Sequence, residues 1–570
     1  MNKKTIRLII NLLVISPALI FSQDIIIGVH TTGLIGDMNI NQSMSGGVTL
    51  FEPSGTPCHL TDVTLNNALS TGDVVIRTTS GDIIFSPGTF VAKTAGRTLT
   101  LEPNDDLIFT LSVDTMGGTG NEFNTNLLNV VVMAGDTAIL GVAETRLVGG
   151  TLNVTAGEVI IQNGGMDTGG GNASFVVTNK FTSSDYGIYT RTGKVNIQAS
   201  DIEIRGGGIQ TDGGDIDFNA TNDINLFGHS ARSQNGSVRA NAKKFKGLNS
   251  NLFDTGTGDI TIEVTDSMIC SGHGFITNGG EIKISATYAE FNESGILSEN
   301  SKVSINLTGS LYATGGINTT NKDIDIAAFA AVFKYDGVET SGIGNLNLNI
   351  TDSVFLSGDG AKANNYFSTG TALTAGGTGI KTTGNISINH TGNVNVSGGG
   401  LFSNGTINST GVDFRMESTK ITSNGGNITL CHTGVIDIDG GGMDSGIGNI
   451  DIGTLGDVTI RESGIITDGG NVAVRAKDQS ITVSGAAINT GFGMSSGGTL
   501  SKVGNVVEND PIQVGGGNII LDTISEIACL PVADIPTLGQ WALINLAFLM
   551  LIVGVNLIRK SEFESLKKQS

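Results

Sequence analysis

The sequence predicts an all-β fold, wound as a right-handed parallel β-helix, and three observations lead to this fold class. Short runs of Ile, Val and Leu alternate with polar residues through the interior of the chain, as is typical of strands. Glycine is abundant, at 83 of 570 residues, but does not recur at every third position as collagen requires. The strand pattern returns after every 21 or 22 residues. A period of this length indicates a solenoid.

Each repeat begins just before a strand of the form Asp/Asn/Glu-Ile-x-Ile. The second residue after the start is always aliphatic, as in Ile216 and Ile450, and the fourth is a large apolar residue apart from Ala240 and Ser409. Residues two apart share one face of a strand, so both positions are expected to point inward. The starts are Gly193, Gly214, Gly236, Gly258, Gly280, Ser301, Lys322 and Gly344, and, after one gap of 40 residues, Gly384, Gly405, Gly426, Gly448 and Gly470.

The best-formed turn carries two further strands. The strand at 448–452 is followed by strands at 456–460 and 464–466, and the next turn starts at Gly470. Three short strands that recur in this way pair with their counterparts in the turns above and below. Glycine and stacked Asp or Asn residues are expected at the corners, where positive φ and amide ladders are favourable.

The two ends of the chain carry different signals. Lys3, Lys4 and Arg7 precede an apolar stretch at 8–21, which is the pattern of a secretory signal peptide. Near the other end, the apolar segment 541–558 would extend about 27 Å as a helix, which is long enough to span a membrane.

Basic residues mark the end of the predicted membrane span. Arg559 and Lys560 follow it directly and are expected to stop transfer and to stay on the cytoplasmic side. The expected organisation is a signal peptide at 1–23, a β-rich cap with the first coils at 24–150, the parallel β-helix at 151–525, a linker with a sorting motif at 526–540, the transmembrane helix at 541–558 and a basic cytoplasmic tail at 559–570.

The linker contains a short motif with a family resemblance. Ile535, Pro536, Thr537, Leu538 and Trp541, followed by the apolar segment and the basic end, resemble the IPTL-CTERM sorting domain of Gram-negative bacteria. The resemblance covers about the last 35 residues. It implies a membrane sorting and processing enzyme as a partner, transient membrane anchoring, and delivery to the cell surface or outer envelope.

The central region has a broader resemblance. Its Gly-Asn-Ile-x-Ile and Gly-Gly-Ile-x-Thr turns, across about residues 70–525, are similar to the β-helical shafts of filamentous-haemagglutinin-like adhesins. This resemblance implies a rod that contacts surface glycans or receptors.

Charge and cysteine content exclude several classes of protein. Residues 24–558 hold 25 Lys and Arg against 51 Asp and Glu, a net charge of −26 compared with −21 for the whole chain. Such a surface repels nucleic acid, so no nucleic-acid partner is expected. The four cysteines are far apart in the sequence, which is unlike a disulfide-stapled scaffold.

Catalytic residues would be expected among the outward residues that lie between the two inward positions of each repeat. In successive repeats these residues form no cluster of acids and bases. Two strands carry carboxylate pairs, Asp215 with Asp217 and Asp437 with Asp439, as an acidic repeat readily does. No cofactor is expected, although glycine-rich acidic corners such as 212–215 leave Ca²⁺ binding open.

One stretch departs from the repeat. Residues 359–378 lack a clean strand, which leaves two interpretations. Tyr366 and Phe367 lie in a loop that forms a contact site, or they belong to a coil of the solenoid whose pattern has drifted. The sequence as a whole predicts an exported structural or adhesive surface rod without enzymatic activity. The alternatives are a secreted polysaccharide-active lyase or hydrolase on the same fold and a passive coat protein.

Overall fold

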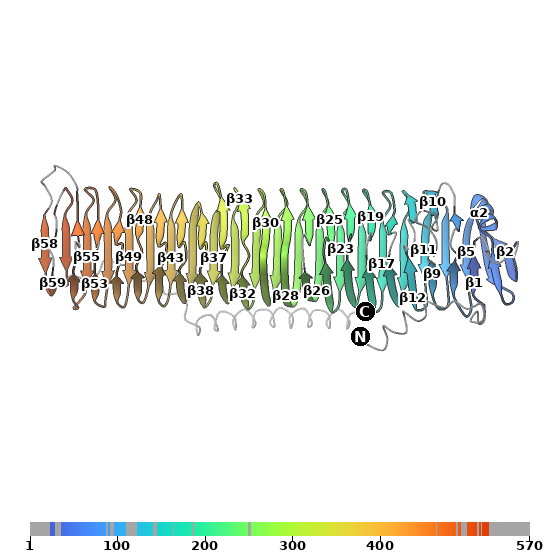
Figure 1. The fold of residues 1–570 in the computed structure, drawn as a ribbon, viewed down its shortest axis with the longest axis horizontal. Coiled ribbons are helices and arrows are strands. Elements are labelled where there is room, and N and C mark those ends of the chain that lie inside the picture. The colour runs from blue at the N-terminus through green and yellow to red at the C-terminus, as the bar shows by residue number, and fades with distance from the viewer. Residues whose placement is uncertain are drawn as a thin grey trace, which may run out of the picture.

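The computed structural model is a rod made from one continuous β-sheet that winds through about 19 turns of about 22 residues (Figure 1). At about 4.8 Å per turn, the rod is roughly 90 Å long. The predicted parallel solenoid with three strands per turn is confirmed. The structure describes residues 23–28, 36–86, 89–91, 96–109, 122–140, 145–162, 165–184, 187–248, 252–462, 464–485, 488–491, 499–509, 512, 514 and 516–523.

A turn places strands on three faces, named A, B and C in chain order. Face A comprises β2 (Ile40–Ser45), β3 (Val48–Pro53), β5 (Asp73–Arg77), β8 (Thr98–Glu102), β11 (Asn129–Met133), β14 (Leu152–Ala156), β17 (Ala173–Val177), β20 (Val195–Ala199), β23 (Ile216–Ala220), β26 (Val238–Leu248), β28 (Ile260–Thr277), β29 (Ile282–Ala286), β31 (Val303–Leu307), β34 (Ile324–Ala328), β37 (Asn345–Ile350), β40 (Asn365–Gly370), β43 (Ile386–His390), β46 (Ile407–Gly411), β49 (Ile428–His432), β52 (Ile450–Thr454), β55 (Val472–Ala476), β60 (Ile519–Asp522) and β58 (Leu500–Val503).

Face B comprises β4 (Cys58–Leu60), β1 (Ile25–Ile27), β6 (Ile83–Phe85), β9 (Leu107–Phe109), β12 (Thr137–Leu140), β15 (Glu158–Ile161), β18 (Lys180–Ser183), β21 (Asp201–Arg205), β24 (Asp223–Phe227), β30 (Tyr288–Ser298), β32 (Ser310–Ala313), β35 (Ala330–Phe333), β38 (Ser353–Leu356), β41 (Ala372–Ala375), β44 (Val394–Ser397), β47 (Phe414–Glu417), β50 (Ile436–Ile438), β53 (Val458–Ile460), β56 (Ile481–Val483) and β59 (Val506–Glu508).

Face C comprises β7 (Phe90–Val91), β10 (Glu122–Asn126), β13 (Thr145–Val148), β16 (Met166–Asp167), β19 (Ile188–Thr190), β22 (Ile209–Thr211), β25 (Ala231–Ser233), β27 (Phe253–Thr255), β33 (Ile317–Thr320), β36 (Val338–Ser341), β39 (Ala361–Ala363), β42 (Ile380–Thr382), β45 (Leu401–Ser403), β48 (Ile421–Ser423), β51 (Met443–Asp444), β54 (Ile465–Ile466) and β57 (Ile488–Asn489). The long strands β26, β28 and β30 turn corners without interruption and so serve more than one face.

The core is a stack of aliphatic and aromatic side chains inside the winding sheet. Ile216 aligns with Val238, which aligns with Ile260, and all three are fully buried. Phe218 and Phe253 stack with ring centroids 6.0 Å apart. The two inward positions predicted for each face A strand are therefore confirmed. Burying one such side chain stabilises the fold by about 1.5–3 kcal/mol.

The corner between faces C and A explains the glycine at the start of most repeats. A Cβ on Gly214 would lie 1.9 Å from the carbonyl oxygen of Gly193 in the preceding turn. The glycine is required by close approach of two backbones rather than by positive φ, which is found instead at the corner between faces B and C, for example at Gly208 with φ +65°.

Polar side chains hold the same corner together. The buried hydroxyl of Thr211 donates a 2.5 Å hydrogen bond to the carbonyl oxygen of Gly214, and serine or threonine recurs at this position through most of the rod. The carboxylate of Asp215 accepts a 3.1 Å hydrogen bond from the backbone N–H of Ser237 in the next turn. Such bonds satisfy backbone groups that the strands leave unpaired at each corner.

Tyr366 and Phe367 lie in a strand of the solenoid, so the interpretation as a contact loop was wrong and the interpretation as a coil with a drifted pattern is confirmed. Tyr366 and Phe367 belong to β40, where Tyr366 aligns with Leu346 and Ile386. Tyr366 is 0% exposed, whereas Phe367 points outward and is 42% exposed. The gap of 40 residues holds two complete turns, because each of these turns is shortened to about 20 residues at its corners. The strand is difficult to recognise in the sequence because a tyrosine occupies an inward position that is aliphatic in the neighbouring turns.

The N-terminal end of the rod is closed by irregular elements. The hairpin of β2 and β3 is antiparallel, and helix α2 (Asp62–Thr71) buries Leu65 and Leu69 against the first turns (Figure 1). Thr61 caps this helix by accepting a hydrogen bond from the N–H of Thr64. Elements of this kind cover apolar side chains at the end of a solenoid.

The other end of the rod finishes with a different arrangement of strands. β60 inserts between β55 and β58, so β58 is the outermost strand of face A within the part of the chain that the structure describes. Lys502 on β58 aligns with the inward Leu521 and forms an ion pair with Glu508. A charge at an inward position disfavours further strand pairing at an edge.

Residues 1–22, the motif at 535–541, the segment 541–558 and the basic tail lie outside the described residues. Within the described ranges, no helix is long and apolar enough to cross a membrane.

Candidate functional site

The carboxylate pairs noted in the sequence form ion pairs with lysine and arginine side chains of neighbouring turns. Asp215 lies 2.7 Å from Lys194, whose hydrogen bond holds the pKa of Asp215 below its usual value. Asp217 lies 3.7 Å from Arg239. The nearer side-chain atoms of Asp437 and Asp439 each lie 3.4 Å from Arg461. These carboxylates therefore take part in ion pairs along the rod, and neither pair forms an isolated acid and base.

Two buried serine and histidine pairs occur inside the rod. Ser368 Oγ lies 2.8 Å from His390 Nε2, and Ser409 Oγ lies 3.1 Å from His432 Nε2. Burial lowers the pKa of each histidine to about 4, so both imidazoles are neutral at pH 7. The distances resemble those of an activated nucleophile, but all four side chains are sealed from solvent. These four residues are therefore part of the core and cannot reach a substrate in solvent.

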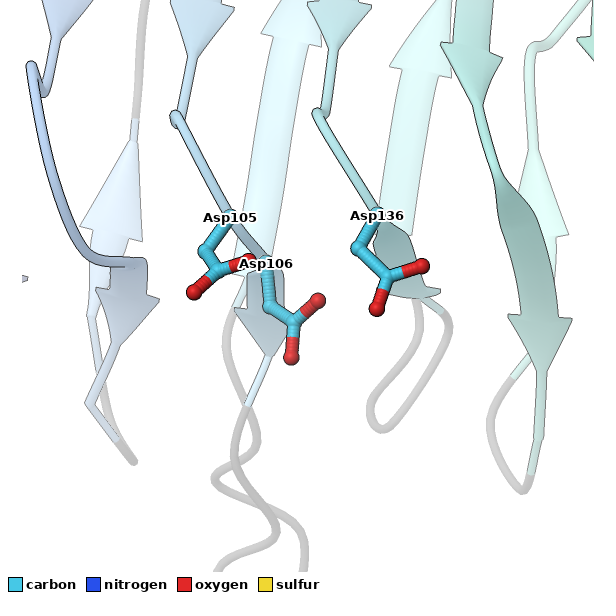
Figure 2. Close-up of side chains that lie close together, drawn as sticks. All are labelled: Asp105, Asp106 and Asp136. Atoms are coloured by element: carbon cyan, nitrogen blue, oxygen red, sulfur yellow. The ribbon is translucent and has the colours of Figure 1, made fainter.

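An acidic group lies near the N-terminal end, where Figure 2 shows Asp105, Asp106 and Asp136 side by side. Their ligand atoms all lie within 4.8 Å of one another. Asp106 Oδ1 also accepts a 2.9 Å hydrogen bond from the N–H of Thr137, and burial raises the pKa of Asp106. Carboxylate oxygens suit Ca²⁺, which takes six to eight ligands, and this group offers three side chains. In the sequence, the corner that left Ca²⁺ binding open was the acidic one at 212–215.

A polar cleft opens on face C. It is a surface cavity of about 350 Å³, lined by Gly207, Gln210, His229, Ala231, Arg232 and Asp254. Gln210, Arg232 and Asp254 are the outward middle residues of β22, β25 and β27, and they align with one another across three turns. His229 projects from the corner between faces B and C. The cleft thus gathers an amide, a guanidinium, a carboxylate and an imidazole on adjacent turns.

An aromatic side chain lies in the same row as the outward residues of the cleft, one turn nearer the N-terminus. Tyr189 on β19 aligns with Gln210 and donates a 2.8 Å hydrogen bond to Asp212 Oδ2. This hydrogen bond raises the pKa of Tyr189 and holds the ring in place. Within the cleft, Arg232 lies 3.5 Å from Asp254.

The sequence reasoning missed this site because it followed only the outward residues of the first strand in each repeat. The third strands read Ile-Tyr-Thr, Ile-Gln-Thr, Ala-Arg-Ser and Phe-Asp-Thr at spacings of 21 or 22 residues, so the sequence already indicates a row of polar and aromatic residues between two inward positions. The corners beside these strands determine which of the side chains border a hollow, and the strand pattern does not describe the corners.

Fold and surface together define the chain as a parallel β-solenoid with a polar cleft on one face. No protein-family model matches the chain, and a search of curated proteins finds no similar sequence.

Proposed function

We propose that this protein is an exported cell-envelope rod with a structural or adhesive role and without enzymatic activity. The observation that carries the proposal is the long solenoid, in which a single core runs through about 19 turns. A rod of this kind places a binding surface at a distance from its attachment point. Its winding is proposed to be right-handed, as in the great majority of parallel β-crossovers.

The ends of the chain support the proposed route. The signal-like stretch at 1–23 would direct export, and Ile535, Pro536, Thr537, Leu538 and Trp541 would be recognised by a membrane sorting enzyme. The span at 541–558 would hold the chain in the membrane during sorting, with Arg559 and Lys560 on the cytoplasmic side.

Surface display can be tested with an antibody against the rod. Intact cells that express the full-length chain are expected to bind the antibody, whereas cells expressing a chain with residues 535–541 deleted are expected to retain the protein in the membrane fraction. A mature protein of unchanged length that remains inside the cell would contradict the proposed route.

The cleft on face C favours a polysaccharide-active enzyme as the second candidate, because Arg232, His229 and Asp254 meet there on adjacent turns. Incubation of the full-length protein with bacterial, algal and host polysaccharides separates the two functions. Retention without new sugar ends supports adhesion, and new sugar ends support the enzyme.

A further inference from the structure

The floor of the face C cleft is rigid. The residues beside its outward side chains, Ile209 and Phe253, are buried in the core. The Thr211 and Thr255 hydroxyls fix the adjacent corner by donating hydrogen bonds of 2.5 and 2.7 Å to backbone carbonyl oxygens. Polar groups that are held on strands in this way lose little freedom when a ligand binds, so less binding energy is spent on ordering them.

The hollow arises from a difference between two successive corners. Residues 206–208 are all glycine, so one corner presents no side chain, whereas His229 projects from the corner one turn later. Arg205 lies over the ring of Phe227, with 4.3 Å between its guanidinium carbon and the ring centroid, and so joins the strands that lead into these corners. The absence of side chains at 206–208 leaves space between the imidazole and Gln210.

The charges of the cleft indicate the chemical class of its ligand. The positive charge of Arg232 is balanced by Asp254 at 3.5 Å, and the chain as a whole carries −21. A polyanion would meet a repulsive field without a net positive site to offset it. A neutral ligand rich in hydroxyl groups can instead accept hydrogen bonds from the guanidinium and donate them to the carboxylate.

From these observations we infer that the face C cleft, formed by Gln210, His229, Arg232 and Asp254, binds a neutral saccharide. The inference rests on the proposed adhesive function and names its ligand class and its site. The volume of about 350 Å³ lies at the small end of ligand pockets, which suits a short segment of a sugar chain. The ring of Tyr189, one turn away, extends the polar surface with an apolar face along the axis of the rod.

Affinity electrophoresis of the full-length protein tests the inference, because the acidic chain migrates readily in native gels. The probes are neutral dextran, galactomannan and arabinoxylan cast into the gel, with polygalacturonate as the anionic comparison. Wild type is expected to be slowed by at least one neutral polysaccharide. Arg232→Gln is expected to weaken that binding about tenfold or more, because it removes a charged hydrogen-bond donor.

A matched control separates the cleft from the rest of the surface. Arg239→Gln removes the same charge from face A at the start of the next turn. The side chain of Arg239 is 56% exposed and pairs with Asp217, and the side chain of Arg232 is 59% exposed. The binding of R239Q is expected to equal that of wild type. Gly207→Phe fills the cleft without removing a polar group, at a glycine that does not have positive φ, and is expected to abolish binding while the circular dichroism spectrum stays unchanged.

The outcomes distinguish this inference from the proposed function. If wild type, R232Q and G207F are slowed equally, adhesion stands and the assignment to this cleft is overturned. If only polygalacturonate slows the protein, the neutral ligand is overturned. If no polysaccharide slows it, the saccharide site is overturned, while surface display is judged separately by antibody labelling.

Discussion

Acidification is expected to loosen the part of the rod that contains the buried histidines. His390 and His432 have pKa values lowered from the usual 6.5 to about 4 by burial. The unfolded chain therefore binds more protons than the folded chain between these values, and stability is lost as pH falls from about 6.5 to about 4. At 1.36 kcal/mol for each pH unit, the loss approaches about 3 kcal/mol per histidine.

Few groups around the two imidazole rings could stabilise a positive charge and so reduce this loss of stability. His390 Nδ1 and His432 Nδ1 have no hydrogen-bond partner among the described residues. The charge of Asp413 acts on His432 in the opposite direction but does not outweigh burial. Protonation would therefore place a poorly compensated charge inside the sheet.

Hydrogen exchange measured by mass spectrometry at pH 7 and pH 4, corrected for intrinsic rates, checks this expectation. Protection of β43 and β49 should fall on the order of 100-fold at pH 4, which corresponds to about 3 kcal/mol. His390→Gln with His432→Gln should remove the dependence, while exposed His229→Gln should keep it. Equal protection of β43 and β49 at both pH values in the wild-type protein would refute the reasoning.

In the N-terminal turns, the dependence of stability on pH is expected to have the opposite sign. Burial, with the charges of Asp106 and Asp24 adding to it, raises the pKa of Asp82 to about 6. The folded state then binds protons more tightly than the unfolded state. The stability of these turns therefore falls as pH rises from the ordinary pKa of 3.8 to about 6. Protection of β6 should therefore increase, or at least not fall, when pH is lowered from 7 to 4.

Three further outcomes are expected. Tyr366→Ala should lower the free energy of unfolding by about 3–5 kcal/mol in urea denaturation because it leaves a cavity, whereas Phe367→Ala on the outward face should change it by about 0.5 kcal/mol or less. Replacement of both Lys502 and Glu508 by valine should expose an apolar edge, and larger species absent from wild type should then appear in sedimentation velocity. Asn385→Ala should cost about 1 kcal/mol in thermal or urea unfolding, because the carboxamide oxygen accepts a 2.8 Å hydrogen bond from the backbone of the next turn.

Strand periodicity was the part of the fold that could be predicted most fully. The recurring apolar pairs, such as Ile216 with Phe218, belong to a local alternation that does not depend on distant residues, and the structure buries them as expected. The same reasoning failed at Tyr366, because an inward tyrosine and two shortened turns broke the pattern without breaking the solenoid.

The role of the corner glycines also required the tertiary structure. The sequence predicted positive φ at the corners, which holds for glycines such as Gly208 between faces B and C. Gly214 is needed for another reason, because the carbonyl oxygen of Gly193 occupies the place of a Cβ. That contact joins two turns, and its distance depends on how closely the corners stack.

The sequence by itself determined the solenoid, its period and its inward faces, because alternating hydrophobicity acts within a few residues. Only the tertiary structure decided which outward side chains meet. Gln210, Arg232 and Asp254 are separated by 22 residues each and become neighbours because three successive turns keep their register. The hollow beside them further depends on a corner without side chains lying next to one that carries His229. The cleft therefore depends on the relative placement of turns, which local sequence patterns do not specify.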